Sequence, residues 1–345
     1  MEDCLSAAAI AAALEAAVLV SVAVVEGSVP REPGARMLVD ATRQWGSVGG
    51  GHLELRAVEV ARSMLAGGET RRLERFPLGP SLGQCCGGVV QLAFELAEPA
   101  HLAALAARPI EDSWRLAALD GAPDLALLDA DGRLLHGAAD LPLADLPLPD
   151  FTRWRGTHIM REPSGRRWLA DLVAAPRARL LLFGAGHVGA AIVRALAELP
   201  CRVSWVDERE DLFPANLPGN VGVEVTDSPE ALAATAAPGT SFLVMTHSHA
   251  LDQRLAETIL KRASYHADWF GLIGSSTKRR QFEHRLRERG VEPARLDAMV
   301  CPIGVAGIEG KAPAVIAAAV AAQLLMVWEA RTAHSDSDSD SPGSS

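Results

Sequence analysis

The feature that most constrains the fold is a glycine-rich turn in the second half of the chain. Residues 178–196 (ARLLLFGAGHVGAAIVRAL) read as an apolar strand, the pattern Gly184-x-Gly186-x-x-Gly189 and a helix. Later apolar segments (TSFLVMT and DWFGLIG) are also strand-like, and each precedes a helical pattern. Alternating strands and helices with short connections are typical of a doubly wound parallel sheet. We therefore predict a Rossmann-like domain over residues 176–330.

In such a turn each glycine has a physical role. The first allows the tight turn, the second lets a pyrophosphate approach the backbone, and the third permits close packing of helix on strand. Asp207 ends the next strand, where a carboxylate accepts hydrogen bonds from ribose hydroxyls, whereas Arg209 beside it suits a 2′-phosphate. His187, inside the turn, is a candidate phosphate donor or proton carrier. The alternative for the turn is that it binds no dinucleotide. The alternative for His187 is that it is a surface histidine at a helix start.

Polar side chains follow the strand TSFLVMT. His247, His249 and Asp252 have a spacing that superficially resembles a metal site. The further His or Asp ligands that a hydrolytic metal site needs are missing from this segment. Because strand ends at this edge line the ligand crevice of doubly wound sheets, the pattern favours a polar cofactor pocket over a metal site.

The strand DWFGLI leads into a second glycine-containing turn. Gly274 and Ser275 come first, and Lys278 follows with two arginines in the first helical turn. Ser275 suits the N-cap position. Cations are unfavourable at the positive end of a helix dipole, so their presence favours a bound anion. A solvated basic face is the alternative.

A third turn, CPIGVAGIEGKAPAVI, precedes the last long helix. Cys301 ends a short strand, Gly304 allows close backbone approach, and Lys311 lies just before the helix. We expect the three turns to converge on one edge of the sheet, as a pocket for a phosphorylated, polar, planar ligand. The helix 314–326 is apolar all round, which predicts burial.

The first half of the chain, residues 1–175, predicts an α+β domain. A helix and a β-branched strand (VLVSVAVV) open it, and a hairpin with an Asp-Gly turn is expected within LALLDADGRLLHG. Cys85 and Cys86 lie in a glycine-rich turn, where an accessible thiol can bind a soft metal or accept sulfur. His52 and Glu54 lie in the helix-start loop GGGHLE. Both loops are candidate sites, and plain turns are the alternative.

Composition excludes several classes of protein. The 33 Lys and Arg residues against 43 Asp and Glu residues give a net charge of −10. Nucleic-acid binders and polybasic membrane-surface proteins need a basic face, so we expect neither nucleic acid nor a membrane as a partner. Five scattered cysteines are too few for a disulfide framework, which favours a cytoplasmic location.

The two ends of the chain carry no targeting pattern. The apolar N-terminal segment contains Glu2, Asp3 and Glu15 and no basic residue before Arg31, unlike a signal peptide. Its change from an alanine-rich helix to a β-branched strand argues against a membrane span. The last residues (SDSDSDSPGSS) offer nothing apolar to bury, and we predict a disordered acidic tail over 331–345.

Taken together, these segments resemble the xanthine dehydrogenase accessory proteins of the XdhC/CoxI type. The matching segments are EGSVPREPGARMLV, GSVGGGHLE, LGQCCGG, LLLFGAGHVG, VDERE, THSHALD, GLIGSSTKRRQF and CPIGVAGIEGKAPAVIAAAVAAQLL. They occur in the family's order and cover nearly the whole chain except the middle connector and the tail. The resemblance implies an N-terminal domain of its own kind followed by a Rossmann domain.

The resemblance also implies a function. Such proteins bind the molybdenum cofactor, a molybdopterin, protect it from oxidation and present it to a cysteine desulfurase for sulfuration. They then insert it into apo xanthine dehydrogenase or a related hydroxylase. By position, Cys85 and Cys86 match the family's cysteine-glycine motif, as candidates for contact with molybdenum or sulfur. His52 stands where some CoxI relatives carry cysteine, which indicates the xanthine dehydrogenase branch. The segment at His247 and Ser248 departs from the Thr-His-Asp-His of many relatives.

Two other functions remain open from the sequence. One is an NAD(P)-dependent oxidoreductase, which the glycine turn and Asp207 support. Against it, no Tyr-Lys pair or similar catalytic set follows, and Tyr265 is the chain's single tyrosine. The other is a scaffold with a vestigial nucleotide fold. We therefore name no catalytic residue and expect an accessory protein rather than an enzyme, with a homo-oligomer left open.

Overall fold

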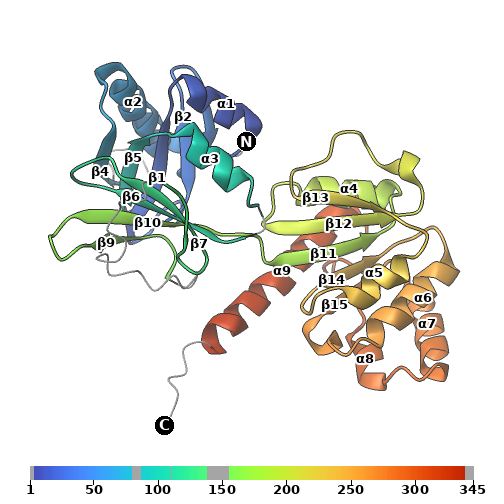
Figure 1. Ribbon diagram of the computed structural model, residues 1–345. Coiled ribbons are helices and arrows are strands. Elements are labelled where there is room, and N and C mark those ends of the chain that lie inside the picture. The colour runs from blue at the N-terminus through green and yellow to red at the C-terminus, as the bar shows by residue number, and fades with distance from the viewer. Residues whose placement is uncertain (1–3, 80–86, 110, 138–154, 339–345) are drawn as a thin grey trace, which may run out of the picture. The chain divides into compact units, whose positions relative to one another are not determined.

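The computed structural model consists of two compact units, Met1–Ala175 and Pro176–Ser345 (Figure 1). It describes residues 4–79, 87–109, 111–137 and 155–338. Each unit has sheets and hydrophobic clusters of its own, so the two are described separately.

The first unit is built on two antiparallel five-stranded sheets, with strand orders β3-β2-β1-β5-β4 and β8-β7-β6-β10-β9. Its elements are α1 (Ala7–Glu15), β1 (Val18–Glu26), β2 (Arg36–Val39), β3 (Gln44–Gly46), α2 (Gly51–Gly67), β4 (Arg71–Pro77), β5 (Val89–Leu96), α3 (Pro99–Ala106), β6 (Ser113–Ala118), β7 (Leu125–Asp129), β8 (Leu134–Gly137), β9 (His158–Arg161) and β10 (Arg167–Val173). The α+β expectation is confirmed. The expected hairpin is also present, because β7 pairs with β8 and Gly132 takes a φ of 81° in the turn.

Small side chains allow the two sheets of this unit to pack against each other. Ala23 and Ala93 come from the first sheet, and Ala117 and Leu169 from the second, and all four form one buried cluster. The amphipathic helix α2 packs on the first sheet through apolar side chains at helical spacing, such as Leu53 and Met64. Both faces of the first sheet therefore contribute to a core.

Charged side chains also connect the two sheets. Asp171 of β10 is fully buried and accepts hydrogen bonds from Arg36 of β2, at 2.8 Å (Nε) and 2.5 Å (Nη2). It also accepts one from Arg115 Nη1 at 2.6 Å and one from Thr157 Oγ1 at 3.0 Å. Arg115, which is 1% exposed, pairs in addition with Glu95 of β5. This buried cluster joins strands of both sheets.

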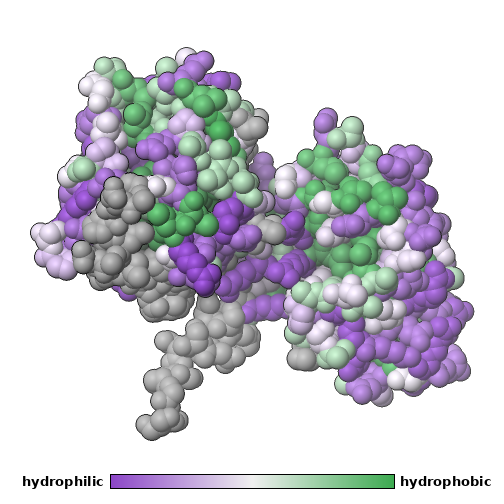
Figure 2. Space-filling model, in the orientation of Figure 1, coloured by the Kyte–Doolittle hydropathy of each residue, from purple (hydrophilic) through white to green (hydrophobic). Residues whose placement is uncertain are grey.

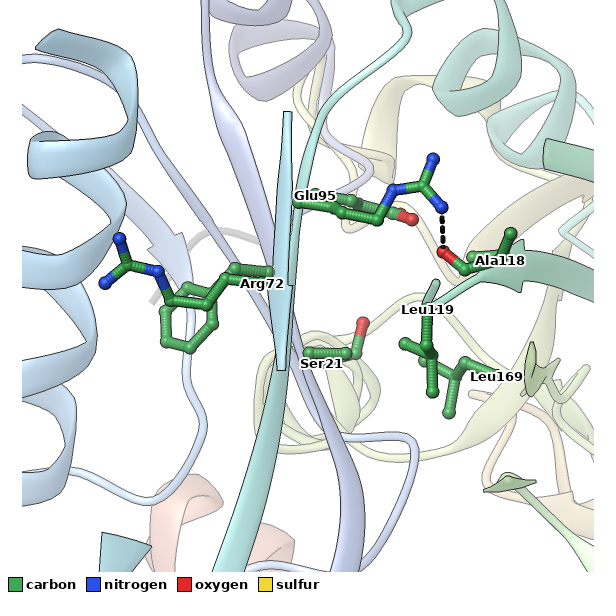
Figure 3. A pocket seen from close by; sticks show the side chains of 10 residues that line it. Ser21, Arg72, Glu95, Ala118, Leu119 and Leu169 are labelled. Carbon is green, nitrogen blue, oxygen red and sulfur yellow. Dashed lines mark hydrogen bonds between the residues drawn. The ribbon is translucent and has the colours of Figure 1, made fainter. Parts of the chain in front are cut away.

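A small pocket lies between the sheets beside this cluster. Figure 3 shows Ser21, Glu95 and Leu169 around it, and Arg71 Nη1 donates to the carbonyl oxygen of Ala118 at 2.6 Å. Glu95 is already paired with Arg115, as described above. The pocket is therefore a gap in the packing between two sheets, and we assign it no ligand.

The second unit contains one five-stranded parallel sheet in the order β13-β12-β11-β14-β15. Its elements are β11 (Ala178–Phe183), α4 (His187–Leu196), β12 (Cys201–Asp207), η3 (Glu210–Leu212), β13 (Val221–Val225), α5 (Pro229–Thr235), β14 (Ser241–Val244), α6 (His249–Leu260), η4 (Tyr265–Ala267), β15 (Trp269–Leu272), α7 (Ser276–Glu288), α8 (Pro293–Ala298) and α9 (Pro313–Asp338). Helices α4 and α9 share one buried cluster with the sheet, and α5 to α8 share another. The predicted Rossmann-like doubly wound sheet is confirmed.

Helix α9 differs from its prediction in two respects. The prediction of burial all round is wrong, because Val320 and Leu324 are buried whereas Val315 is 38% exposed and Met326 is 66% exposed. The helix also continues to Asp338, although the disordered tail was expected from residue 331. A packed helix extends at little cost, since each added residue gains a backbone hydrogen bond.

The apolar character of α9 bears on membrane insertion. Within the described part of the chain, the segment Pro313–Arg331 has a length and a mean hydropathy (1.6) that would allow it to cross a membrane. Core helices of soluble proteins meet the same criterion, and a third of this segment is buried. In Figure 2, apolar (green) and hydrophilic (purple) patches adjoin on the surface of the second unit.

Candidate functional site

A crevice lies at the carboxyl ends of four strands of the Rossmann sheet. Its volume is about 400 Å³ including the open mouth, and its lining residues are Phe183, Gly184, Val206, Asp207, Glu208, Thr226, Asp227, Pro229, Thr246, His247, Leu251 and Arg254. These residues come from the ends of β11, β12, β13 and β14 and from the helices α5 and α6 that follow. Apolar side chains and hydrogen-bonding groups therefore meet in one crevice, at the edge where doubly wound sheets bind ligands.

The glycine turn begins at the crevice, which Gly184 lines, and the three glycines are required or allowed there for different geometric reasons. Gly184 takes a φ of 121°, and a Cβ atom there would overlap the carbonyl oxygen of Met245. A Cβ atom at Gly189 would overlap the carbonyl oxygen of Gly184, which also accepts a hydrogen bond from Trp205 Nε1 at 3.0 Å. Gly186 is exposed, and a Cβ atom there would meet nothing within 4 Å. The backbone at Gly186, the N-cap of α4, is thus open to a ligand.

Asp207 is tied to the glycine turn and to Arg209. Its Oδ2 accepts from Ala185 N at 2.7 Å and Arg209 Nη2 at 2.9 Å, and its Oδ1 accepts from Arg209 N at 3.1 Å and Nε at 2.8 Å. Burial raises the pKa of Asp207, but the hydrogen bonds from Arg209 and Ala185 outweigh burial and lower the pKa to about 2. The carboxylate is therefore ionised at neutral pH and has both oxygens occupied by protein donors.

Three histidines lie at or near this edge. His187 and His249 are exposed first residues of α4 and α6, outside the crevice lining. His247 lines the crevice, with its Nε2 3.8 Å from Glu208 Oε1. No group of three or more His, Cys, Asp or Glu side chains suited to a metal ion occurs in the segments that the structure describes. Of the three histidines, His247 is therefore the one whose side chain lines the crevice.

The turn after β15 has a different arrangement. Ser275 caps α7, accepting from Lys278 N at 3.3 Å. The Lys278 ammonium folds back and donates to Asp252 Oδ2 at 2.7 Å and to the carbonyl oxygen of Ile273 at 2.8 Å. A Cβ atom at Gly274 would lie 2.6 Å from Lys278 Cδ, which shows how closely the side chain covers the turn. The positive charge of Lys278 is therefore balanced by a buried carboxylate of the protein itself.

The third turn also lies outside the crevice lining. Cys301 is 2% exposed, and burial raises the pKa of its thiol, so it is not a thiolate ligand in this state. Gly304 exchanges two hydrogen bonds with the side-chain amide of Gln323, at 2.8 and 3.1 Å. Lys311 is exposed before α9. Of the three turns expected to converge, the crevice lining includes Gly184 of the first and no residue of the other two, and the His247 loop contributes to it instead.

In the first unit, the loop before α2 is held by Glu54. This side chain is 9% exposed and accepts from Gln44 Nε2 at 2.7 Å, Ser47 Oγ at 2.6 Å and Gly50 N at 3.0 Å. A carboxylate thus already occupies the N-terminal turn of the helix, where it is favourable. His52 is exposed. Glu54 stabilises this loop and has few acceptor sites left for a ligand.

The segments around the cysteine pair come together in the first unit. Cys85 and Cys86 themselves lie outside the described residues. The neighbouring Gly88 donates to the carbonyl oxygen of Ser28 at 3.1 Å, and a Cβ atom at Gly49 would lie 2.5 Å from Pro30 Cγ. The chain that follows the cysteines therefore packs on the loop after β1, which also contacts the glycine loop before α2.

Sequence reasoning missed part of the crevice. Thr226, Asp227 and Pro229 follow β13, a strand whose residues are all partly or fully exposed and which has no strong apolar pattern. Arg254 lies one helical turn into α6 and donates to Glu230 Oε1 at 2.6 Å. The only available signal was the Thr-Asp-Ser-Pro sequence, a typical strand-to-helix connection.

Comparison with known proteins places this geometry in a family. Residues 10–77 match the model of the XdhC and CoxI family, and residues 180–324 match the model of the XdhC Rossmann domain, together more than half of the chain. The Escherichia coli (strain K12) uncharacterized protein YqeB is 32% identical over 157 residues, which are 44% of this chain and 27% of that protein. This chain therefore corresponds to only a fraction of that curated relative.

A solved structure agrees in fold. The crystal structure of a Bacillus halodurans protein, described as a xanthine dehydrogenase, has a TM-score of 0.70 at 20% identity and covers 96% of this chain and 97% of its own. At this identity the likeness concerns the fold. The two family matches, in order and on the two units described above, show that the chain belongs to the XdhC and CoxI family.

Proposed function

We propose that this protein is a molybdenum cofactor chaperone that takes part in the maturation of xanthine dehydrogenase or a related hydroxylase. It receives the cofactor as cargo, shields it, presents it to a cysteine desulfurase for sulfuration and delivers it to the apo enzyme. Membership of the XdhC family suggests the role in xanthine dehydrogenase maturation. We place this work in the cytoplasm, where the thiols of Cys201 and Cys301, free in the structure, stay reduced.

The observation that carries the proposal is the open carboxyl edge of the Rossmann sheet. The cargo is a planar pterin with a phosphate and a dithiolene-bound metal. The N-terminus of α4, open at Gly186, suits the phosphate. The apolar side chains of Phe183 and Leu251, together with the hydroxyl of Thr246, suit a planar polar ring. None of the described residues that line this crevice is a cysteine, so we assign the sulfur chemistry to another part of the chain.

Cys85 and Cys86 are the residues we propose for that chemistry. Both stand in the cysteine-glycine motif, and the three other cysteines of the chain are buried. Burial raises the pKa of Cys201 to about 11 and also raises that of Cys301, which leaves both as poor nucleophiles at neutral pH.

The test is the activation of apo xanthine dehydrogenase by the loaded protein, with a cysteine desulfurase present. The wild-type protein is expected to activate the hydroxylase. The double variant Cys85→Ser/Cys86→Ser is expected to lower the activation rate by at least about tenfold, because the soft ligand or sulfur acceptor is lost. Activity of the hydroxylase with its substrate is the measurement.

A matched control separates thiol chemistry from folding. Cys4 belongs to the same unit and is buried in the cluster around α1, so Cys4→Ala is expected to retain the wild-type rate. A double variant as active as the wild type would remove the two cysteines from the mechanism. Failure of the wild-type protein to activate the enzyme would remove the chaperone function itself.

A further inference from the structure

The two edges of the parallel sheet differ in how they are covered. The outer side of the edge strand β15 is bridged by Val300, whose N–H donates to the carbonyl oxygen of Phe270 at 2.9 Å. Among the residues that the structure describes, the opposite edge strand β13 has β12 as its single neighbour in the sheet (Figure 1). An edge strand of this kind can pair with a strand from another chain.

The backbone of β13 directs hydrogen-bonding groups away from the sheet. The carbonyl oxygen of Asn220 accepts from Val203 N at 3.0 Å, and Thr226 N donates at 3.3 Å to the carbonyl oxygen of the last residue of β12. The even-numbered residues therefore direct their backbone groups towards β12. Because this direction alternates along a strand, the N–H and C=O groups of Val223 and Val225 point outwards from the sheet.

The side chains of β13 also alternate between two faces. Val221 packs on the buried cluster of α4 and α9, and Val223 and Val225 follow on the same face, with Val225 48% exposed. Gly222 and Glu224 are exposed on the other face. The strand has no proline, lysine or bulge, the features that commonly protect exposed edges. This edge is therefore fit to accept another strand.

The strand is complementary to a second copy of itself. In an antiparallel pair centred on Val223, Val221 lies opposite Val225 of the partner subunit, and Gly222 lies opposite Glu224 of the partner subunit. The backbone groups that this pair uses are those that point outwards. Valines then meet valines on one face, and on the other each glutamate meets a glycine instead of a like charge.

Other registers of the same pair fit less well. Moving the centre by one residue would require backbone groups that already face β12. Moving it by two residues, to Val221 or Val225, would leave two of the three valines without a valine opposite. The register centred on Val223 is therefore the one that uses the whole strand.

We propose that the protein forms a two-fold symmetric dimer in which β13 pairs antiparallel with β13 of a second copy, joining the two parallel sheets into one continuous sheet. The pairing extends to the crevice, because Thr226 and Asp227 directly follow β13 and line it. In the same register, Asp227 lies opposite Gly219 of the partner subunit, so the connection before β13 in the partner borders the crevice. The dimer goes beyond the chaperone function, because it concerns the assembly of two copies and not the cargo.

Gly222 allows the register to be tested without disturbing the monomer, because a Cβ atom there would meet nothing within 4 Å. Sedimentation velocity of the full chain over a series of concentrations is the measurement. Gly222→Glu places a glutamate opposite Glu224 twice in each dimer, and it is expected to weaken the dimer at least about tenfold. Gly222→Lys places an opposite charge there and is expected to strengthen it.

Two further variants complete the test. Gly222→Gln, as long as Gly222→Glu but uncharged, is the control and is expected to stay within about threefold of the wild type. Val223→Pro removes an N–H that points away from β12, which edge strands tolerate, and it is expected to abolish the dimer. Circular dichroism and thermal unfolding of each variant confirm that it is folded.

A wild-type chain that is monomeric at every concentration, or a dimer that Gly222→Glu and Gly222→Lys change alike, would overturn the proposal. A monomeric wild type in which Gly222→Glu lowers the activation of the hydroxylase would assign this edge to that enzyme, and it would overturn the dimer as well. Activation of the hydroxylase by the wild-type protein is measured separately, so failure of the dimer and failure of the chaperone function are distinguishable.

Discussion

Replacing Asp171 with alanine is expected to lower the free energy of unfolding of the first unit by about 3–5 kcal/mol. The reason is that Arg115, which is 1% exposed, loses its fully buried partner and retains Glu95, while Arg36 and Thr157 each lose their hydrogen bonds to the same carboxylate. The guanidinium charge inside the cluster is then only partly compensated, and a buried charge without full compensation is costly. Hydrogen exchange of peptides from β6 and β10, measured in denaturant on the full chain, reports this unit separately.

The same carboxylate predicts a pH dependence. Burial raises the pKa of Asp171, but Arg36 and Arg115 outweigh burial, and the pKa lies below its ordinary value of 3.8. A carboxyl with a depressed pKa contributes stability that is complete above the unfolded pKa, about 3.9, and is lost as the pH falls through the folded value. The wild-type unit should lose stability below about pH 4, and Asp171→Ala should lose less over that range.

Arg56→Ala is the control for this prediction. Arg56 pairs with Glu59 on the surface of α2, both side chains being more than half exposed, and surface pairs contribute at most about 1 kcal/mol. If Asp171→Ala were no more destabilising than Arg56→Ala, the buried cluster would not hold the two sheets together.

Replacing Lys278 with methionine is expected to destabilise the second unit by a similar amount, about 3–5 kcal/mol. Asp252 is 1% exposed and would lose the ammonium that lies 2.7 Å from its Oδ2. Asp252 also accepts from Thr246 N at 3.0 Å and Thr246 Oγ1 at 2.7 Å, which fixes the loop that carries His247. Hydrogen exchange of peptides from α6 and β14 is the measurement.

Two further variants make this second prediction specific. Lys278→Met/Asp252→Asn removes both charges but keeps an oxygen for Thr246, and it should recover a large part of the lost stability. Lys261→Met removes an exposed pair with Glu257, at 2.9 Å, and should cost less than about 1 kcal/mol. A double variant as unstable as the single one would contradict the buried-charge explanation.

Local sequence patterns predicted the parts of the fold that depend on neighbours in the chain. The turn from Gly184 to Gly189 combines an apolar strand, three glycines and a helix, and these alone require the tight connection that the structure has. The hairpin at Gly132 is equally local. Such features follow from backbone geometry within a few residues.

Features that depend on distant pairing were not predictable. Lys278 was expected to meet a bound anion, but the folded chain brings it to Asp252, 26 residues earlier. Arg209 and Asp207 were treated as alternatives for one ribose, whereas they form one bidentate pair. Side chains of opposite charge reach each other only after the strands have taken their places in the sheet. No local sequence pattern shows that β12 and β13 lie on one side of β11 and that β14 and β15 lie on the other.

The most direct test of the chaperone function is to identify what the protein carries. The full chain is purified from a host that makes the molybdenum cofactor, and its bound molecules are identified by mass spectrometry, with molybdenum measured on the same sample. The account predicts a molybdopterin in a near-stoichiometric amount, and none in protein from a host blocked in cofactor synthesis. Protein that carries no molybdopterin when the host makes it in excess would contradict the account.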